Sequence, residues 1–317
     1  MDPLSDVLQL LSARSYITSG QSAGECWSMR YPGFSGMKFI ALRKGTLWFR
    51  LESESAWRKL TAGDGVILTR SAPFIMASDP ELEPINSEQV PYQKRNGIAD
   101  YGGDESLLLA GKMEIDQTGA GQLLDALPVI IPINTGSESS STLNWLMARL
   151  HEENMSLRPG ASLAGNHLMQ LVMIEGIRSW ILSEEQALDG WLGALRDSRI
   201  LAALVAIHAE PEKPWQLAEL AAISGMSRAG FSRRFTESAG TSPLNYLTRW
   251  RMHIASRALR LTKEPVKQLA WRLGYAAEST FCTAFKRIYG ESPTAHRAAY
   301  LEGPVYPLHA FHSKGPE

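Results

Sequence analysis

The sequence predicts an α+β protein in which short antiparallel strands and a following pair of helices precede an all-α domain with two helix-turn-helix units. Three observations predict it: strand-like sequence between Met37 and Met76, helical spacing of apolar residues after residue 142, and a segment in the last third that repeats itself. At 317 residues the chain is longer than one hydrophobic core ordinarily fills. We therefore expect two domains, at 1–190 and 196–300, followed by a tail at 301–317.

The composition argues against several classes of protein. A chain with 44% hydrophobic and 21% charged residues is ordinary for a globular protein. The start, MDPLSDVLQL, has two acidic residues and no basic one, unlike a secretory signal, and no apolar run reaches the length of a membrane span. Cys26 and Cys282 lie far apart and form neither a metal-ligand cluster nor a disulfide framework. We expect a cytoplasmic protein with no membrane partner, metal or cofactor.

The near-neutral net charge of −1 conceals a division along the chain. Residues 196–300 hold 16 Lys and Arg against 8 Asp and Glu, whereas residues 1–195 hold 15 against 23. A basic domain of this kind is a candidate surface for a polyanion, although a basic face often serves only solubility.

The strands are expected before about residue 135. Between Met37 and Met76, aromatic and β-branched residues are broken by glycine-containing turns, which predicts a meander of short antiparallel strands. The stretch from Pro80 to Gly103 is rich in Pro, Glu, Asn and Gly, and we interpret it as a long loop. A strand near Leu107–Ile115 and the segment LPVIIPI follow.

Two helices are expected at about 142–182. Apolar residues recur at helical spacing in Thr142–Met155 and again in Ala161–Leu182, and Pro159-Gly160 suits the break between them. The pair has more large apolar residues than the face of one sheet needs for cover. We favour a homodimer contact here, and the alternative is packing against the β domain.

The last third of the chain contains a repeat. When the segment is shifted by 49 to 50 residues, it aligns with itself. The matched residues are Leu220-Ala221 and Leu269-Ala270, Gly225 and Gly274, Phe231 and Phe281, Phe235 and Phe285, and Gly240–Pro243 and Gly290–Pro293. Such self-similarity indicates a duplicated supersecondary unit.

Each repeat unit has the pattern of a helix-turn-helix. A short helix runs into a glycine, which permits a tight turn, and a second helix begins after Ser227 or near Glu278. The phenylalanine pairs at i and i+4 predict the buried stripe of each second helix. The outer faces are small, polar or basic, as entry into a major groove requires, and comprise Arg228, Ala229, Ser232, Arg233 and Thr236 in the first unit and Glu278, Ser279, Cys282, Thr283 and Lys286 in the second.

A helix joins the two units. Ser242-Pro243 starts it and PLNYLTRWRMHIASRALRL continues it to Leu261, a length of about 28 Å. This approaches the roughly 34 Å rise of one DNA turn, so the two units can enter successive grooves. Arg249 and Arg251 on this helix suit either a structural contact or a phosphate.

These residues resemble the AraC family of bacterial transcription regulators. The resemblance rests on WQLAELAAISGMSRAGFSRRFTESAGTSPLNYLTRWRM and PVKQLAWRLGYAAESTFCTAFKRIYGESPTAHR, which cover about a hundred residues. It implies a seven-helix DNA-binding domain whose first helix lies near Asp197–Ala209, and base contacts from the two outer faces. The chain departs from the plainest pattern at Glu278 and Cys282, so the second unit is expected to contact phosphate more than bases.

The amino-terminal part resembles the cupin-type sensor domain of one subgroup of the family, which implies an antiparallel β-barrel. Metal-binding cupins need histidines on their strands, and the first histidine of this chain is His151, beyond them, which argues against such a site. Trp27, Phe39, Trp48 and Phe74 are candidates for an effector pocket, although aromatic residues of a small barrel are more often core. Cys26 is a candidate redox sensor if its thiol is exposed.

The leading hypothesis is a transcription regulator that binds double-stranded promoter DNA as a homodimer. Its β domain would respond to a small molecule or chemical stress, and RNA polymerase is a further candidate partner. One alternative is a cupin-like enzyme with an appended DNA-binding domain, and another is an architectural DNA binder without an effector. The missing strand histidines count against the enzyme.

Overall fold

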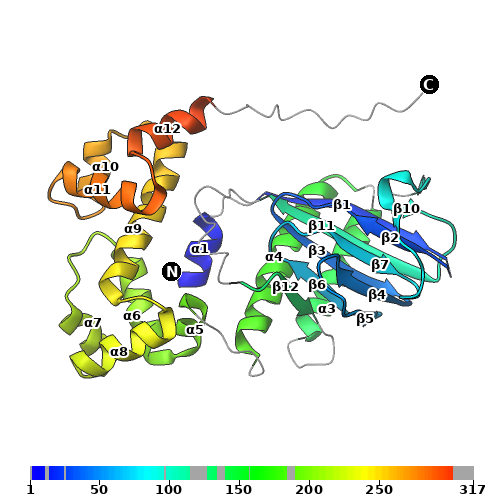
Figure 1. Cartoon of the computed structure of the whole chain (residues 1–317), viewed down its shortest axis with the longest axis horizontal. Helices are drawn as coiled ribbons and strands as arrows, with labels where there is room; N and C mark the ends of the chain where they lie inside the picture. Colours follow the sequence, from blue (N-terminus) through cyan, green and yellow to red (C-terminus); the bar gives the residue numbers. More distant parts are fainter. Residues whose placement is uncertain are drawn as a thin grey trace.

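The computed structural model describes residues 2–10, 14–24, 26–95, 98–114, 127–133, 140–156, 158–183 and 190–302. A sandwich of strands with two covering helices forms one part of the molecule, and a set of shorter helices forms the other (Figure 1). The tail from residue 303 onward, including most of the predicted 301–317 segment, lies outside the described residues.

The amino-terminal part begins with a short helix and continues with strands. Its elements are α1 Pro3–Leu10, β1 Arg14–Ala23, β2 Ser28–Tyr31, β3 Met37–Lys44, β4 Thr46–Leu51, β5 Arg58–Thr61, β6 Gly65–Leu68, β7 Phe74–Ala77, β8 Ile85–Asn86, the 3-10 turn η1 Ser87–Gln89, β9 Gln93–Arg95, β10 Ile98–Asp100, β11 Ser106–Glu114 and β12 Ile130–Ile133.

The described strands form two sheets. One has the order β12-β6-β3-β11-β1-β10-β9 and the other the order β5-β4-β7-β2-β8. Most neighbours are antiparallel, but β1 pairs with β10 and β2 with β8 in parallel. Among the described residues the two sheets face each other without closing into a barrel, so the antiparallel β domain is confirmed and its closure is not.

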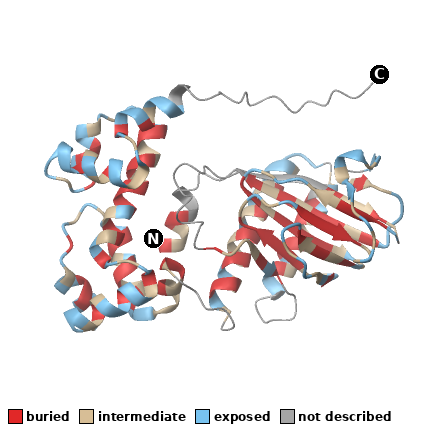
Figure 2. Cartoon of the chain, viewed as in Figure 1, coloured by how far each residue is buried: buried red, intermediate tan, exposed pale blue. Residues whose placement is uncertain are grey.

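Alternation along β3 separates two hydrophobic cores. Ile40 and Leu42 point between the sheets, where they pack with residues such as Phe49 of the second sheet. Met37 and Phe39 point to the opposite face, which α3 Ser140–Met155 and α4 Ala161–Leu182 cover. Strands β6 and β7 are accordingly buried throughout, whereas β8 and β9 are exposed (Figure 2).

The second part of the chain consists of helices. They are α5 Trp191–Arg196, α6 Ser198–Ala209, α7 Leu217–Ile223, α8 Arg228–Ala239, α9 Pro243–Leu261, α10 Val266–Arg272, α11 Glu278–Tyr289 and α12 Pro293–Glu302. Asp197 caps α6 by accepting hydrogen bonds from the backbone of Arg199 and Ile200.

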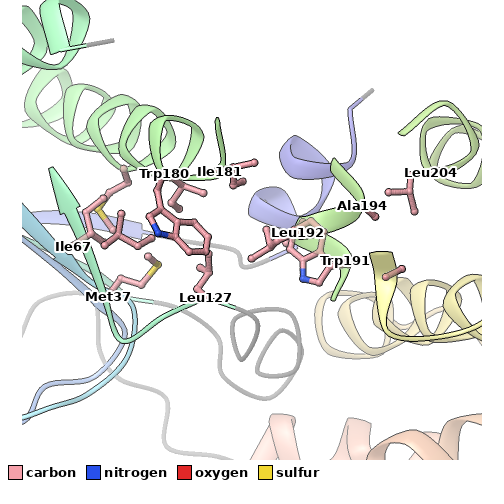
Figure 3. Close-up of a cluster of buried hydrophobic side chains, with 14 of the residues drawn as sticks. Met37, Ile67, Leu127, Trp180, Ile181, Trp191, Leu192, Ala194 and Leu204 are labelled. Atoms are coloured by element: carbon pink, nitrogen blue, oxygen red, sulfur yellow. The ribbon is translucent and has the colours of Figure 1, made fainter. Parts of the chain in front are cut away.

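The core on the helical face of the sheet continues into the second part of the molecule. Trp180 of α4 lies at one end of this region and Trp191 and Leu192 of α5 at the other, with Leu204 of α6 beyond them (Figure 3). The core then extends along α8 and into the first half of α9, as far as Trp250. The second half of α9 packs with α10 and α11 in a separate core.

Helix α1 packs against α6 and α9 of the second part, although it precedes the first strand in sequence (Figure 1). His208 of α6 connects them: its Nδ1 lies 3.0 Å from Asp6 Oδ2 and its Nε2 lies 2.8 Å from the Tyr246 hydroxyl. Burial lowers the pKa of His208 to about 3, so the ring is neutral. A neutral ring that donates from Nδ1 and accepts at Nε2 satisfies both contacts.

Several predicted elements have the predicted bounds, and two predictions are wrong. The helices Ala161–Leu182 and Pro243–Leu261 coincide with α4 and α9, and the strand near Leu107–Ile115 is β11. The predicted loop from Pro80 to Gly103 contains β8, β9 and β10, and β10 joins the first sheet. The predicted meander is also incomplete, because β3 pairs with β6 and β11 while β4 belongs to the other sheet.

Candidate nucleic-acid interface

Two helix pairs of closely similar geometry form the candidate site. We call α7 with α8 the first head and α10 with α11 the second head. In both, the chain turns at a glycine with positive φ, +61° at Gly225 and +77° at Gly274. The residue after each glycine then donates its N–H to the first helix, from Met226 to Ala221 O at 2.9 Å and from Tyr275 to Ala270 O at 3.0 Å. The two repeat units therefore share the same hydrogen bond across their turns.

The second helix of each head buries its phenylalanines and exposes the opposite face. Phe231, Phe235, Phe281 and Phe285 are fully buried. On the outer face Ser232 and Cys282 are half-buried, and the other predicted contact residues are exposed: Arg228, Ala229, Arg233, Thr236, Glu278, Ser279, Thr283 and Lys286. The structure thus brings each predicted set together on one helix surface, consistent with the exposed helix faces in Figure 2.

Neighbouring arginines of the first head differ in their contacts. Within the described chain Arg228 and Arg233 are exposed and make no ion pair or hydrogen bond. Arg234 instead pairs through its Nε with Asp197, the cap of α6. Arg233 therefore has a free guanidinium group at the surface, and Arg234 holds α8 against α6.

Arg251 of α9 has a structural role. It is buried, and its guanidinium donates to the carbonyl oxygens of Pro211 at 2.5 Å, Glu212 at 3.1 Å and Lys213 at 2.9 Å. It also lies 5.4 Å from the ring centroid of Tyr275 in the second head. Of the two alternatives for this residue, these contacts favour the structural one, because the buried guanidinium joins the loop after α6 to the second head.

The beginnings of α8 and α11 differ. Ser227 caps α8, its hydroxyl accepting from the Gly230 N–H at 3.2 Å. Ala277 precedes α11 and provides no side-chain cap. The first N–H groups of α11 consequently have no side-chain partner from the cap position. The carboxylate of Glu278 is at the first residue of this helix.

The hydroxyls of the two outer-face threonines bond to their own helices. Thr236 donates to Ser232 O at 2.8 Å and Thr283 donates to Ser279 O at 2.9 Å. Each hydroxyl proton is therefore engaged one turn back, which leaves the lone pairs and the methyl group for a base edge.

The four aromatic candidates for an effector pocket do not share one environment. Trp27 and Phe74 lie in the core between the sheets, and Phe39 lies in the core under the helices. Trp48 is half-buried on β4, with the Lys59 ammonium 5.7 Å from its ring centroid. Trp27 Nε1 is buried and has no hydrogen-bond partner in the described structure. The pocket assignment stays a prediction, and Cys26, which is exposed, stays a candidate for oxidation.

Comparison with known proteins identifies the family. A family model described as Cupin matches residues 2–182, more than half of the chain, and one described as Helix-turn-helix domain matches residues 220–299. An AraC-like transcription regulator of Streptomyces lividans is 34% identical over 299 residues, which cover 94% of this chain and 98% of the relative. This chain belongs to the AraC family of transcription regulators.

Two further proteins similar to this AraC-family chain are a transcriptional regulator and a DNA-binding domain. The HTH-type transcriptional regulator AlkR of Acinetobacter baylyi is 31% identical, over 74% of this chain and 79% of that one. The DNA-binding domain of AdpA, solved in complex with a target DNA, is 33% identical over 31% of this chain and 88% of that one, with a TM-score of 0.30.

The AraC-family protein has surface and structural residues that sequence analysis did not single out. Thr280 is exposed in the first turn of α11, beside Ser279. Arg234 and Asp6 are structural residues whose partners come from distant elements, so no local pattern marks them. Burial, together with the nearby Glu278 carboxylate, raises the pKa of the Cys282 thiol. The raised pKa favours the protonated thiol, which reacts with oxidants less readily than a thiolate does.

Two features of the described residues concern metal binding and membrane spanning. No group of three or more His, Cys, Asp or Glu side chains in them is placed to hold a metal ion. None of the helices found there is long and apolar enough to cross a bilayer.

Proposed function

We propose that this AraC-family regulator binds promoter DNA with both heads in successive major grooves, and that the first head reads most of the sequence. The observation that carries the proposal is the pair of equivalent helix faces on α8 and α11. On α8 the free guanidinium groups of Arg228 and Arg233 flank Ser232. Arginine bonds to guanine through two donors, so this face suits direct readout of bases.

We propose that the second head contributes mainly through the DNA backbone. The uncapped N–H groups at the start of α11 suit a phosphate oxygen. Lys286 and Arg287, both exposed, supply positive charge further along the helix. The Glu278 carboxylate repels a phosphate at the first residue of α11. We therefore propose that the phosphate lies near the next residues, Ser279 and Thr280.

We propose that a small molecule bound by the β domain controls the heads. The core that continues from the sheet through α5 to α8 gives such control a physical route. A second route is α1, which precedes β1 in the chain and contacts α9 through the hydrogen bonds of His208. A change in the sheet can therefore alter the first head without a separate hinge.

The same proposal assigns the protein a dimeric, non-enzymatic role in the cytoplasm, with RNA polymerase as a candidate contact once DNA is bound. Exposed apolar side chains on α3 and α4 support the dimer: Trp145, Met155, Leu163, Leu171 and Leu182. The regulators among the relatives support a role without catalysis, and the proposal requires no cofactor.

The assignment of the first head is tested by changing adjacent arginines. Footprinting on the protein's own promoter should reveal protection in two successive major grooves per subunit. Arg233→Ala should weaken binding by about tenfold or more, because a base contact of this kind contributes about 1–3 kcal/mol. Arg234→Ala is the matched control, since its guanidinium contacts Asp197, and it should weaken binding much less than Arg233→Ala does. Equal affinity of the Arg233→Ala variant and the wild type would remove the assignment.

A further inference from the structure

One lysine of the sandwich points between the two sheets. Lys38 alternates with Met37 and Phe39 on β3 and so shares a face with Ile40 and Leu42 of the core between the sheets. Its Nζ lies 5.0 Å from the ring centroid of Phe74, 5.6 Å from that of Phe34 and 5.8 Å from that of Tyr31. The side chain is half-buried, so part of it is withdrawn from water.

A second lysine lies directly opposite. Lys112 of β11 is the cross-strand partner of Lys38, and paired residues of neighbouring strands point to the same face. Like charges in this position are unfavourable for the sheet. Burial, and then the charge of Lys112, lowers the pKa of Lys38 to about 8.

No carboxylate of the described chain forms an ion pair with Lys38, which distinguishes it from Lys44 at the other end of the same strand. The Lys44 ammonium lies 2.8 Å from Asp104 Oδ2 at an exposed position. Around Lys38 the described contacts are aromatic: Tyr31 stacks on Phe74 with ring centroids 4.8 Å apart, and its hydroxyl donates to Gln21 Oε1 at 2.6 Å. These rings hold the amine in place without a counter-ion.

We propose that Lys38 is a covalent binding site for an aldehyde or ketone with an apolar body, which it captures as a reversible imine. The inference deepens the function proposed above, on which it rests, by naming the effector class. The amine lone pair attacks the carbonyl carbon, and the oxygen gains a proton to give a carbinolamine. Loss of water then leaves the C=N bond, and hydrolysis reverses both steps without any oxidant or reductant.

Two properties of the site favour this chemistry. A lysine amine becomes nucleophilic when it is desolvated in apolar surroundings or placed beside another cation, and Lys38 has both conditions. The half-buried rings of Phe34 and Tyr31 offer apolar surface to the carbon skeleton of the ligand, beside the fully buried Phe74. Conversion of the ammonium to an imine at neutral pH also removes part of the repulsion with Lys112.

The site is tested by reductive trapping in the full-length protein. Hexanal or benzaldehyde is added with cyanoborohydride at neutral pH, and peptide mass spectrometry locates the alkylated lysines. We expect Lys38 to be labelled at least about tenfold faster than Lys44, because burial and Lys112 favour the neutral amine of Lys38, whereas the Lys44 ammonium is paired with Asp104. Lys38→Arg, which keeps the charge, should abolish labelling at this position and leave Lys44 labelling unchanged. Thermal unfolding of the variant checks that it is folded.

Three outcomes would overturn the inference. Labelling of Lys38 no faster than that of Lys44 would show that the amine is not activated. If hexanal forms no adduct with Lys38 and hexanoate binds there instead, the site is a noncovalent anion site. Labelling that leaves promoter affinity unchanged would remove the role as effector site. By contrast, failure of the untreated protein to bind its promoter would count against the proposed function and not against the reactivity of Lys38.

Discussion

The glycines in the turns of the two heads have similar backbone angles but different surroundings. A Cβ on Gly274 would lie 2.0 Å from Glu212 O, whereas a Cβ on Gly225 would meet no atom within 4 Å. Gly225→Ala should therefore cost only the left-handed backbone conformation, about 1–2 kcal/mol. Gly274→Ala adds a clash with backbone that Arg251 holds in place, and should cost clearly more. Urea unfolding of both variants measures the difference, and equal losses would contradict the close approach at Gly274.

The neutral imidazole of His208 makes stability depend on pH. Its pKa falls from 6.5 to about 3 on burial, so below pH 6.5 the unfolded chain binds a proton that the folded chain does not. The stabilisation is complete above pH 6.5 and is lost as the pH falls from 6.5 to about 3. Over this range the free energy of unfolding falls by up to about 1.4 kcal/mol per pH unit. The facing groups are Asp6, Tyr246 and Trp250. Asp6, whose pKa burial raises, acts in the opposite direction, since its contribution is lost as the pH rises.

Comparison of variants isolates the contribution of His208. His208→Gln lacks the titrating group, so its free energy of unfolding should fall less between pH 6.5 and pH 4 than that of the wild type. His167→Gln is the control, because His167 is exposed on α4. Chemical unfolding at a series of pH values gives the slopes, and parallel curves for wild type and His208→Gln would show that this histidine is not the source.

At the scale of the element, the cap of α11 offers a test of the second head. Ala277→Ser and Ala277→Asp should each stabilise the protein by about 1 kcal/mol, because both side chains can accept from the free N–H groups. Only the aspartate adds a charge that repels phosphate. If α11 begins beside a phosphate, Ala277→Asp should weaken promoter binding and Ala277→Ser should do so much less. Equal affinities, measured by gel shift, would place the phosphate elsewhere.

The local sequence predicted those elements whose ends are marked by proline or glycine. Pro243 and Gly160 mark the starts of α9 and α4, and periodic apolar residues set their lengths. The repeat predicted both buried phenylalanine pairs and the outer faces. By contrast, α1 spans only eight residues, and its place is set by α6 and α9, about 200 residues later. The segment Pro80–Gly103 contains strands of two or three residues, which are too short for a pattern of alternation.

The whole molecule concentrates positive charge in the helical part, and this makes DNA affinity depend on salt. Each phosphate contact by a lysine or arginine contributes about one unit to the slope of log affinity against log salt, through counterion release. Lys286→Ala should therefore reduce the slope by about one and weaken binding to all sequences alike. Lys59→Ala, on an exposed strand position far from the heads in sequence, should leave the slope unchanged. An unchanged slope for Lys286→Ala would mean that α11 does not reach the backbone there.

The continuous core that ends at Trp250 has a consequence for how such regulators exchange parts during evolution. A recombination joint at residues 190–196 would separate Trp180 from Trp191 and Leu192 and so combine two halves of one interior that had not evolved together. A joint between Trp250 and Met252 in α9 falls between the two apolar cores, where the contacts of Arg251 with Glu212 and Tyr275 still cross it. Chimeras with relatives should tolerate the second joint better than the first. We therefore expect the sensor to be exchanged together with its first head more readily than alone.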